Sequence, residues 1–275
     1  MSGALAEVRE LCVRYVPERG APVLALADVN LRIEQGEVLG ILGESGSGKS
    51  TLAAAMLRLL PASAEVSGSI LLEDCELTEM DSDQLRKIRG HRISIVPQDP
   101  AMSLNPIMRA GTQVSEVLRA HLELTRAERK VRVRELLGEV GFDDPERIAD
   151  SYPHQLSGGQ RQRVVIAQAI ACSPALVVAD EATSKLDPAL QMQIQSLMSA
   201  IVRRDGTALI WITHDPATLA GFADNTAVMQ AGRIVEHGAT TDLFRKPAHP
   251  YTRTLVGLAK EFALGAAASS TQYAH

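Results

Sequence analysis

The stretch "GESGSGKST", residues 43–51, decides the fold of this chain. It matches the pattern G-x-x-x-x-G-K-[ST] at every fixed position and lies in the context that the pattern requires. The apolar run "EVLGILG" (37–43) before it is typical of a buried strand, and "KSTLAAAMLRLL" (49–60) after it reads as a helix stopped by Pro61. A strand, a glycine-rich loop and a helix in this order predict a phosphate-binding loop in an α/β fold.

The residues of this loop have distinct chemical roles. Glycines let the backbone turn its N–H groups inward around phosphates, while Lys49 reaches the β- and γ-phosphates and the Ser50 hydroxyl can ligate Mg²⁺. We expect the following residues to bind the nucleotide: Gly43, Glu44, Ser45, Gly46, Ser47, Gly48, Lys49, Ser50 and Thr51.

A second chemical element is "ALVVADEA" (175–182), an apolar strand that ends in two carboxylates. Asp180 at the strand end is expected to hold Mg²⁺ through water, and Glu181 to polarise the attacking water as a general base. A solvated acidic pair is the alternative, but the phosphate loop favours the catalytic interpretation. The stretch "SKLD" (184–187) is a near match to a guanine-reading N/T-K-x-D motif, but it follows too soon after Glu181 for a GTPase.

The rest of the chain alternates between strand and helix patterns. Further strands are predicted at 7–15, 23–33, 92–96, 175–180 and 208–213. Between about 100 and 160 the spacing is helical and strand patterns are absent, which predicts an all-helical insert. Past residue 225 we expect two short strands and two helices, and the small, polar tail 261–275 is predicted to be disordered.

Composition narrows the class of protein. The 275 residues carry a formal net charge of −5, which argues against a nucleic-acid binder. Cys12, Cys75 and Cys172 lie far apart without a CxxC pattern, which is typical of reduced thiols. No apolar run approaches the ~18 residues that a membrane span needs, and the start of the chain is unlike a signal peptide. Any membrane role is therefore expected to be peripheral.

A second glycine-containing stretch, "LSGGQRQR" (156–163), leads into a helix that is expected to begin near Gln160. A helix N-terminus offers free N–H groups and a partial positive charge, so it favours an anion. With "GESGSGKST", "VVADE" and "ITHD" in this order, the chain resembles an ATP-binding-cassette (ABC) ATPase over residues 5–260. The resemblance implies a P-loop NTPase core, an N-terminal antiparallel β portion and an all-helical subdomain near 100–160.

The resemblance also implies that two chains complete each ATP site. In this family the signature loop of one subunit closes over the ATP held by another. The residues implied at that loop are Ser157, Gly158, Gly159 and Gln160. Tyr15 matches the aromatic residue that stacks on adenine, and Asp187 matches an aspartate that crosses the dimer interface.

The catalytic set follows from the same resemblance. Gln98 in "IVPQDP" matches the glutamine that contacts Mg²⁺ and the attacking water, and His214 in "ITHD" matches the histidine that senses the γ-phosphate. The implied catalytic residues are Glu181, His214, Gln98 and Lys49, and the implied magnesium ligands are Ser50, Gln98 and Asp180. The implied cofactors are ATP and Mg²⁺.

Two departures and two narrower motifs refine the resemblance. Lys185 replaces the usual small residue near the interface, and Ala182 stands where proline is common. The stretches "QDPAMSLNPIMRAGTQVSE" (98–116) and "LFRKPAHPYTRTLVGL" (243–258) resemble ATPases of dipeptide, oligopeptide or nickel importers. The former would help to form a groove for a membrane subunit. The cysteine cluster that many such relatives carry after the last helix does not occur, so an iron–sulfur site is not expected.

The expected function is ATP hydrolysis that drives import of peptides, nickel or a related small solute. The chain is expected to lie peripherally on the cytoplasmic face of the inner membrane. Its implied partners are two multi-span permeases, a second ATPase (identical or paralogous) and an extracytoplasmic substrate-binding protein, without nucleic acid. The alternative is a soluble ABC ATPase of DNA repair or translation, which tends to have a long coiled-coil insert or two cassettes in one chain.

Overall fold

A six-stranded sheet organises the chain, for which a computed structural model describes residues 4–17 and 20–257. Its strand order is β10-β9-β3-β8-β7-β6. These strands are β3 (Val38–Leu42), β6 (Ile93–Val96), β7 (Leu176–Asp180), β8 (Ala208–Thr213), β9 (Asn225–Gln230) and β10 (Arg233–Ala239). All of them pair in parallel except β10, which runs antiparallel to β9. The parallel strands end at one edge of the sheet, where ligands of open α/β sheets bind.

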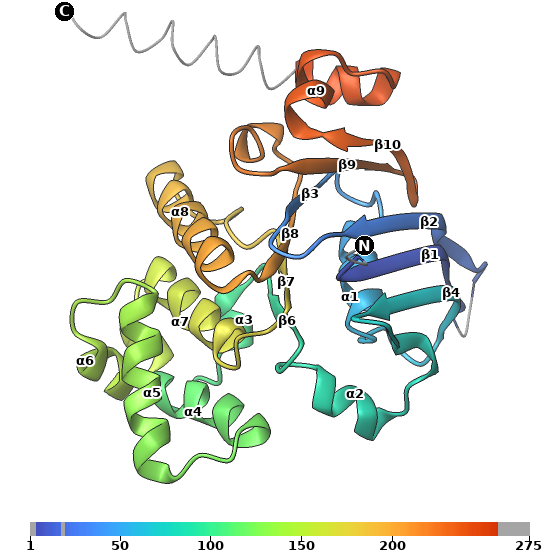
Figure 1. The fold of residues 1–275 in the computed structure, drawn as a ribbon. Coiled ribbons are helices and arrows are strands. Elements are labelled where there is room, and N and C mark those ends of the chain that lie inside the picture. Colours follow the sequence, from blue (N-terminus) through green and yellow to red (C-terminus); the bar gives the residue numbers. More distant parts are fainter. Residues whose placement is uncertain (1–3, 18–19, 258–275) are drawn as a thin grey trace, which may run out of the picture.

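A smaller antiparallel sheet of order β2-β1-β4-β5 packs against this core. Its strands are β1 (Ala6–Tyr15), β2 (Val23–Ile33), β4 (Ala64–Leu72) and β5 (Cys75–Glu76). The sequence patterns predicted β1 and β2 but did not predict β4 or β5. Figure 1 shows this sheet on one side of the six-stranded sheet and the helices α4–α7 on the other.

The two faces of the six-stranded sheet have separate cores. Along β3, Leu39 and Ile41 point to the face that packs on the small sheet, whereas Val38 and Leu42 point to the helical side. Side chains alternate between the faces of a strand, so a continuous apolar run is what a strand buried on both faces requires. The run 37–43 therefore predicted the central strand correctly.

Helices fill the chain between the strands. They are α1 (Lys49–Met56), α2 (Ser82–Ile88), α3 (Pro100–Ser103), α4 (Ala110–His121), α5 (Arg126–Glu139), α6 (Pro145–Asp150), α7 (Gly158–Ile170), α8 (Pro188–Asp205) and α9 (Thr240–Arg245), with short 3₁₀ turns at Leu77–Glu79, Pro153–Gln155 and Pro216–Thr218. Between residues 100 and 160, all of which are described, the structure has helices and no strand. The expected fold class, an α/β core with an antiparallel β portion and a helical subdomain, is confirmed.

The end of α1 differs from the prediction. The helix ends at Met56 rather than at residue 60, because Arg58 adopts a left-handed backbone with φ of 55°. The guanidinium of Arg89 then donates to the carbonyl oxygen of Leu57 at 2.7 Å and to that of Arg58. A cation at a helix C-terminus satisfies its free carbonyls and complements its dipole. Pro61 is therefore not what stops this helix.

After β10 and α9, the chain forms a last helix at residues 250–257. Both short strands and both helices expected past residue 225 are present. The tail 261–275, predicted to be disordered, lies outside the described residues. The domain limits 5–260 and the subdomain limits near 100–160 remain predictions.

Candidate functional site

Three neighbouring strands bring the candidate catalytic side chains together at their carboxyl ends. Gln98 follows β6, Glu181 follows β7 and His214 follows β8. The amide Nε2 of Gln98 donates to Oε2 of Glu181 at 2.8 Å, and Nδ1 of His214 lies 3.4 Å from Oε1 of the same carboxylate. Glu181 has a left-handed φ of 47°, at the turn that leaves the strand. The sheet order thus places an amide and an imidazole on either side of one carboxylate.

The phosphate loop lies beside them, between β3 and α1. Lys49 is buried, and its ammonium donates to the carbonyl oxygens of Gly43 at 2.7 Å and Glu44 at 2.8 Å. Burial lowers the pKa of Lys49, while the carboxylates of Glu181 and Asp180 oppose this change. A buried cation that faces two acids and an open loop is suited to bind phosphate oxygens.

Glycine is needed in this loop for its backbone shape. Gly46 and Gly48 have φ of 82° and 105°, which other residues rarely adopt. A Cβ atom on Gly48 would lie 2.9 Å from the carbonyl oxygen of Ala25, whereas one on Gly46 would meet no atom within 4 Å. Gly48 therefore allows close packing on β2, and Gly46 faces open space where a ligand could lie.

Side chains with oxygen atoms that can coordinate Mg²⁺ lie near the start of α1. The Ser50 hydroxyl donates to Oδ1 of Asp180 at 3.2 Å, and Gln98 lines the same cavity as Ser50. Burial raises the pKa of Asp180, so its ionised form lacks the solvation that it has in water. A hydroxyl, a carboxylate and an amide oxygen are ligands that Mg²⁺ accepts, and nucleotide phosphates usually supply the rest. The three residues predicted for the metal therefore fit it.

One cavity of about 540 Å³ joins the phosphate loop to the candidate base-binding residue. Tyr15, Gln98 and Glu181 all line it. The residues that sequence reasoning missed in this cavity are Val23, Leu24, Ala25, Ala231 and Gly232. Val23 is 59% exposed and pairs in register with Tyr15, so an apolar surface extends beside the ring. The sequence predicted a strand at 23–33 but carries no signal that its first residues line this cavity.

The signature residues lie elsewhere. Ser157 caps α7: its hydroxyl accepts from the Gln160 amide at 3.2 Å, and Oε1 of Gln160 accepts from the Ser157 amide at 2.9 Å. Both line a second cavity, of about 340 Å³, that shares no residue with the first. A Cβ atom on Gly158 would meet no atom within 4 Å, whereas one on Gly159 would lie 2.3 Å from Leu190. Gly158 therefore faces open space and Gly159 packs against α8.

The loop between Glu181 and α8 holds the two remaining residues of interest. Asp187 caps α8 by accepting from the amide of Leu190 at 3.0 Å, and it does not line the nucleotide cavity. Lys185 donates to Oδ2 of Asp99 at 2.6 Å. Asp99 is the residue that follows Gln98 in the sequence. The interaction with Lys185 holds the pKa of Asp99 below its usual value. The lysine that departs from the family pattern thus joins two loops of its own chain.

Comparison with known proteins agrees with this geometry. The family model described as ABC transporter matches residues 26–184. A probable peptide ABC transporter ATP-binding protein of Sinorhizobium fredii is 44% identical over 254 residues, which cover 92% of this chain and 76% of that protein. A dipeptide transport ATP-binding protein of Haemophilus influenzae is 44% identical over 263 residues, which cover 95% of this chain and 79% of that protein.

Solved structures give the same result for the fold. An ATP-binding cassette solved as a post-hydrolysis dimer with ADP and phosphate superposes with a TM-score of 0.76 at 30% identity. The match covers 86% of this chain and 98% of that one. The fold and site define a nucleotide-binding cassette of the P-loop class. The chain belongs to the ABC transporter family.

Proposed function

We propose that this chain is the ATP-binding subunit of an ABC importer and that it hydrolyses ATP to drive uptake of peptides. The observation that carries the proposal is the single cavity in which the phosphate loop meets Gln98 and Glu181. The relatives named above are ATP-binding proteins of peptide and dipeptide transporters, which favours peptides over nickel as the substrate.

In the proposed reaction, Glu181 accepts a proton from water as the oxygen attacks the γ-phosphorus, and the bond to the bridging oxygen of ADP breaks. Gln98 and His214 flank the carboxylate and keep it directed into the cavity. Lys49 and the amides of the phosphate loop stabilise negative charge that spreads over the γ-phosphate oxygens. Tyr15, with Val23 beside it, offers a face for the adenine ring.

Mg²⁺ is the metal that we propose for this site, held by Ser50, Gln98 and Asp180. Bound there, it would neutralise charge on the β- and γ-phosphates. The Ser50 hydroxyl lies within hydrogen-bond distance of the Asp180 carboxylate, so the two side chains are already together where they would hold the ion.

We propose that the signature residues Ser157–Gln160 serve the ATP of a second ATPase subunit. Three observations support this. Ser157, Gly159 and Gln160 line a cavity separate from that of the phosphate loop. A Cβ atom on Gly158, at the N-terminus of α7, would meet no atom within 4 Å. The related cassette named above was solved as a dimer. Asp187, at the start of α8, is proposed to cross the same interface.

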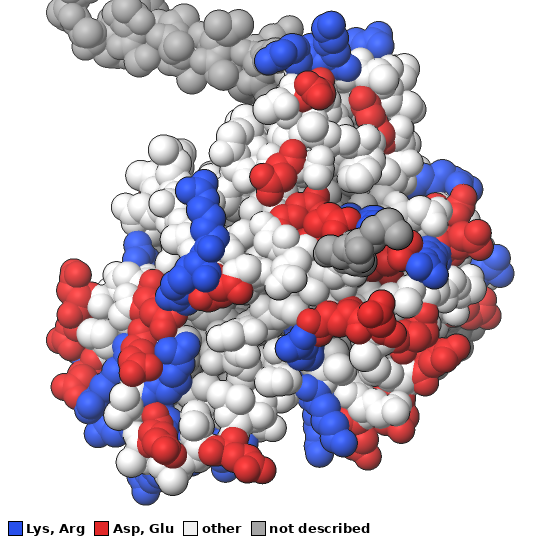
Figure 2. Space-filling view, in the orientation of Figure 1, with Lys and Arg blue, Asp and Glu red and all other residues white. Residues whose placement is uncertain are grey.

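The proposed partners also include two permeases and an extracytoplasmic binding protein, with the chain on the cytoplasmic face of the inner membrane. Among the helices that the structure describes, none is long and apolar enough to cross a bilayer. Met102 and Ile107, 86% and 81% exposed, lie in the segment proposed to form the groove for a permease. Figure 2 shows basic and acidic side chains interspersed on one face, which does not favour a nucleic-acid partner there.

The soluble alternative is less well supported. The two longest helices between residues 100 and 160 are α4 and α5, of 12 and 14 residues, which are far from a long coiled coil. The experiment that tests the proposal is uptake of a labelled dipeptide by vesicles that contain the chain with its permeases and binding protein. ATP-dependent uptake that is lost in Lys49→Ala supports it. ATP hydrolysis without association with any permease would favour the soluble alternative.

A further inference from the structure

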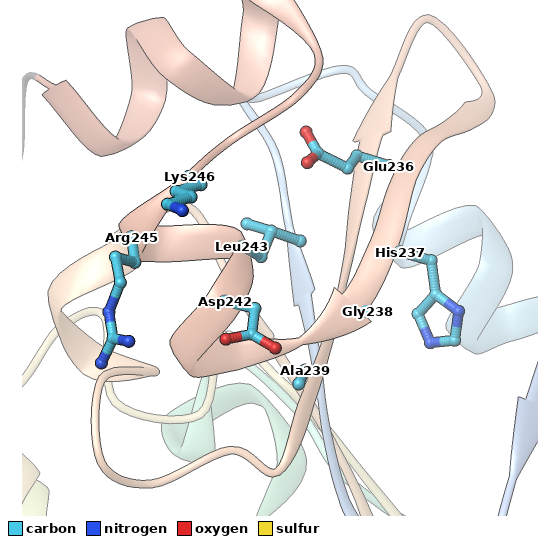
Figure 3. A pocket seen from close by; sticks show the side chains of 8 residues that line it. All are labelled: Glu236, His237, Gly238, Ala239, Asp242, Leu243, Arg245 and Lys246. Carbon is cyan, nitrogen blue, oxygen red and sulfur yellow. The ribbon is translucent and has the colours of Figure 1, made fainter.

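The segment "HPYT", residues 249–252, opens the last helix and has no part in the reaction described above. It is held on the edge strand β10 by one carboxylate. Oε1 of Glu236 accepts from the amide of Ala248 at 2.8 Å, and Oε2 accepts from the amide of His249 at 3.0 Å. Figure 3 shows Glu236 on β10 with its carboxylate directed toward the segment that follows α9. The start of the last helix is thereby fixed to the sheet.

The fixed segment presents a tyrosine to the phosphate loop. The amide of Tyr251 donates to Nδ1 of His249 at 3.2 Å, and the Tyr251 hydroxyl accepts from the amide of Glu44 at 3.1 Å. Glu44 and Tyr251 are 207 residues apart in the sequence. The ring packs against the helical-side core, to which Leu255 of the same helix belongs, and Val256 of that helix is also buried. The Tyr251 hydroxyl therefore belongs to a side chain that is fixed in place by the packing of its helix.

Glu44 is the second residue of the phosphate loop, and its backbone is engaged at both ends. Its carbonyl oxygen accepts from Nζ of Lys49 at 2.8 Å and from the amide of Ser47 at 3.2 Å. Its amide is the group that Tyr251 binds. Contacts to the carbonyl come from within the loop and move with it, whereas the tyrosine ties the loop to a separate element. Burial raises the pKa of Tyr251, so its hydroxyl stays neutral at physiological pH.

We propose that Tyr251 is a positioning residue for the phosphate loop: its hydroxyl holds the Glu44 amide and so fixes the loop in the form that binds nucleotide. The last helix, through "HPYT", then affects ATP affinity without touching ATP. This inference rests on the proposed function of the loop, and it assigns a role to a motif that the reaction leaves unused.

The test is Tyr251→Phe, which removes one oxygen and keeps the ring in its packing. Binding of ATP and of ADP to the purified chain is measured by calorimetry, and exchange of the Glu44 amide by hydrogen–deuterium mass spectrometry. Loss of one neutral hydrogen bond predicts a roughly two- to tenfold weaker affinity for both nucleotides. It also predicts faster exchange at Glu44 and a thermal midpoint close to that of the wild type.

Two control variants separate positioning from general stability. Tyr152→Phe removes a tyrosine hydroxyl from another part of the chain and should leave nucleotide affinity unchanged. Leu255→Ala, at a buried position of the same helix, should lower the thermal midpoint and shows how affinity responds to a loosened helix.

An unchanged affinity in Tyr251→Phe, with normal binding by the wild type, would overturn the inference alone. So would a loss of affinity in proportion to a lowered midpoint, as in Leu255→Ala. If the wild type itself binds neither ATP nor ADP, the proposed function fails first.

Discussion

The side chains of Gln98 and Glu181, from loops 83 residues apart, are joined by a hydrogen bond of 2.8 Å between Nε2 and Oε2. The amide therefore occupies one oxygen of the carboxylate that we propose as the general base. Each carboxylate oxygen has two lone pairs, so the same oxygen can accept this hydrogen bond and still take a proton from water. The pair thus connects the Gln98 loop, which leads into α3 and the helical subdomain, to the proposed general base.

Lys185 and Asp99 form a second contact between the same two loops, because Asp99 follows Gln98 and Lys185 lies in the loop after Glu181. The pair is exposed, so we expect Lys185→Ala to leave the thermal midpoint close to the wild type. Without the ammonium, the pKa of Asp99 should rise toward its usual value, which NMR titration can follow. We expect ATP turnover to be lower in Lys185→Ala than in the wild type. Lys185→Arg, which keeps the positive charge, should not show this loss.

The charge-swapped double variant, Lys185→Asp with Asp99→Lys, should recover more activity than either single change alone. A double variant that is only as active as the worse single variant would show that Lys185 acts on something other than Asp99.

Asp180 gives a prediction about metal and pH. Because burial raises its pKa, the folded chain disfavours the ionised carboxylate relative to the unfolded chain. Asp180→Asn should therefore keep or raise the thermal midpoint without Mg²⁺, and should lose most of the stabilisation that MgATP gives the wild type. That stabilisation is about 2.7 kcal/mol at a ligand concentration 100 times the Kd.

The sign of the pH effect follows from the same shift. The folded wild type keeps the Asp180 proton to higher pH than the unfolded chain, so its metal-free stability falls as pH rises from the usual aspartate range through the raised pKa. Asp180→Asn should lack this part of the pH dependence. Thermal melts in EDTA across acid to neutral pH measure it, and identical profiles for the two proteins would contradict the assignment.

Gly232 in the β9–β10 turn supports the phosphate loop from the other side. Its amide donates to the carbonyl oxygen of Ser47 at 3.0 Å, and its own carbonyl accepts from the amide of Ala27 at 2.9 Å. Gly232 and Gly221 both have left-handed backbones, but a Cβ on Gly232 would lie 2.6 Å from the carbonyl oxygen of Ala25, whereas one on Gly221 meets nothing within 4 Å.

Substitution of each glycine by alanine gives a matched pair of variants, whose free energies of unfolding can be compared by urea denaturation. Gly221→Ala should cost about 1–2 kcal/mol, from backbone strain alone. Gly232→Ala should cost about 1–3 kcal/mol more because of the overlap, and should also weaken ATP binding. Equal effects of the two changes would mean that the turn does not support the loop.

The sequence located the elements that carry the candidate catalytic side chains, because each element is marked by a local pattern. The phosphate loop, the acids after β7 and the histidine after β8 each follow an apolar run, and a parallel sheet brings strand ends together. It did not predict β4, whose stretch "AEVSGSILL" breaks its alternation at Gly68. Contacts between distant segments were also missed. The Arg89 guanidinium at the end of α1 and the Tyr251 hydroxyl on the phosphate loop have no signal in either segment alone.

The proposal that two chains complete each ATP site can be tested with two inactivating substitutions. Lys49→Ala disables the phosphate loop, and Ser157→Arg should block the facing site by its size and misplaced charge. In a homodimer, a mixed pair places both lesions in one site and leaves the other intact, so some activity should return on mixing. If the second ATPase is a paralogue, the lesions go into the two different chains. Proven mixed dimers that stay inactive would argue against independent composite sites.

The role of Glu181 as the general base of ATP hydrolysis is tested by measuring ATP binding and turnover together in Glu181→Gln. We expect the assembled variant to bind ATP as the wild type does, to accumulate as an ATP-bound dimer on size exclusion, and to turn over about 10²–10⁴ times more slowly. Lys49→Ala serves as the control that should lose binding. Turnover by Glu181→Gln at the wild-type rate would contradict the assignment.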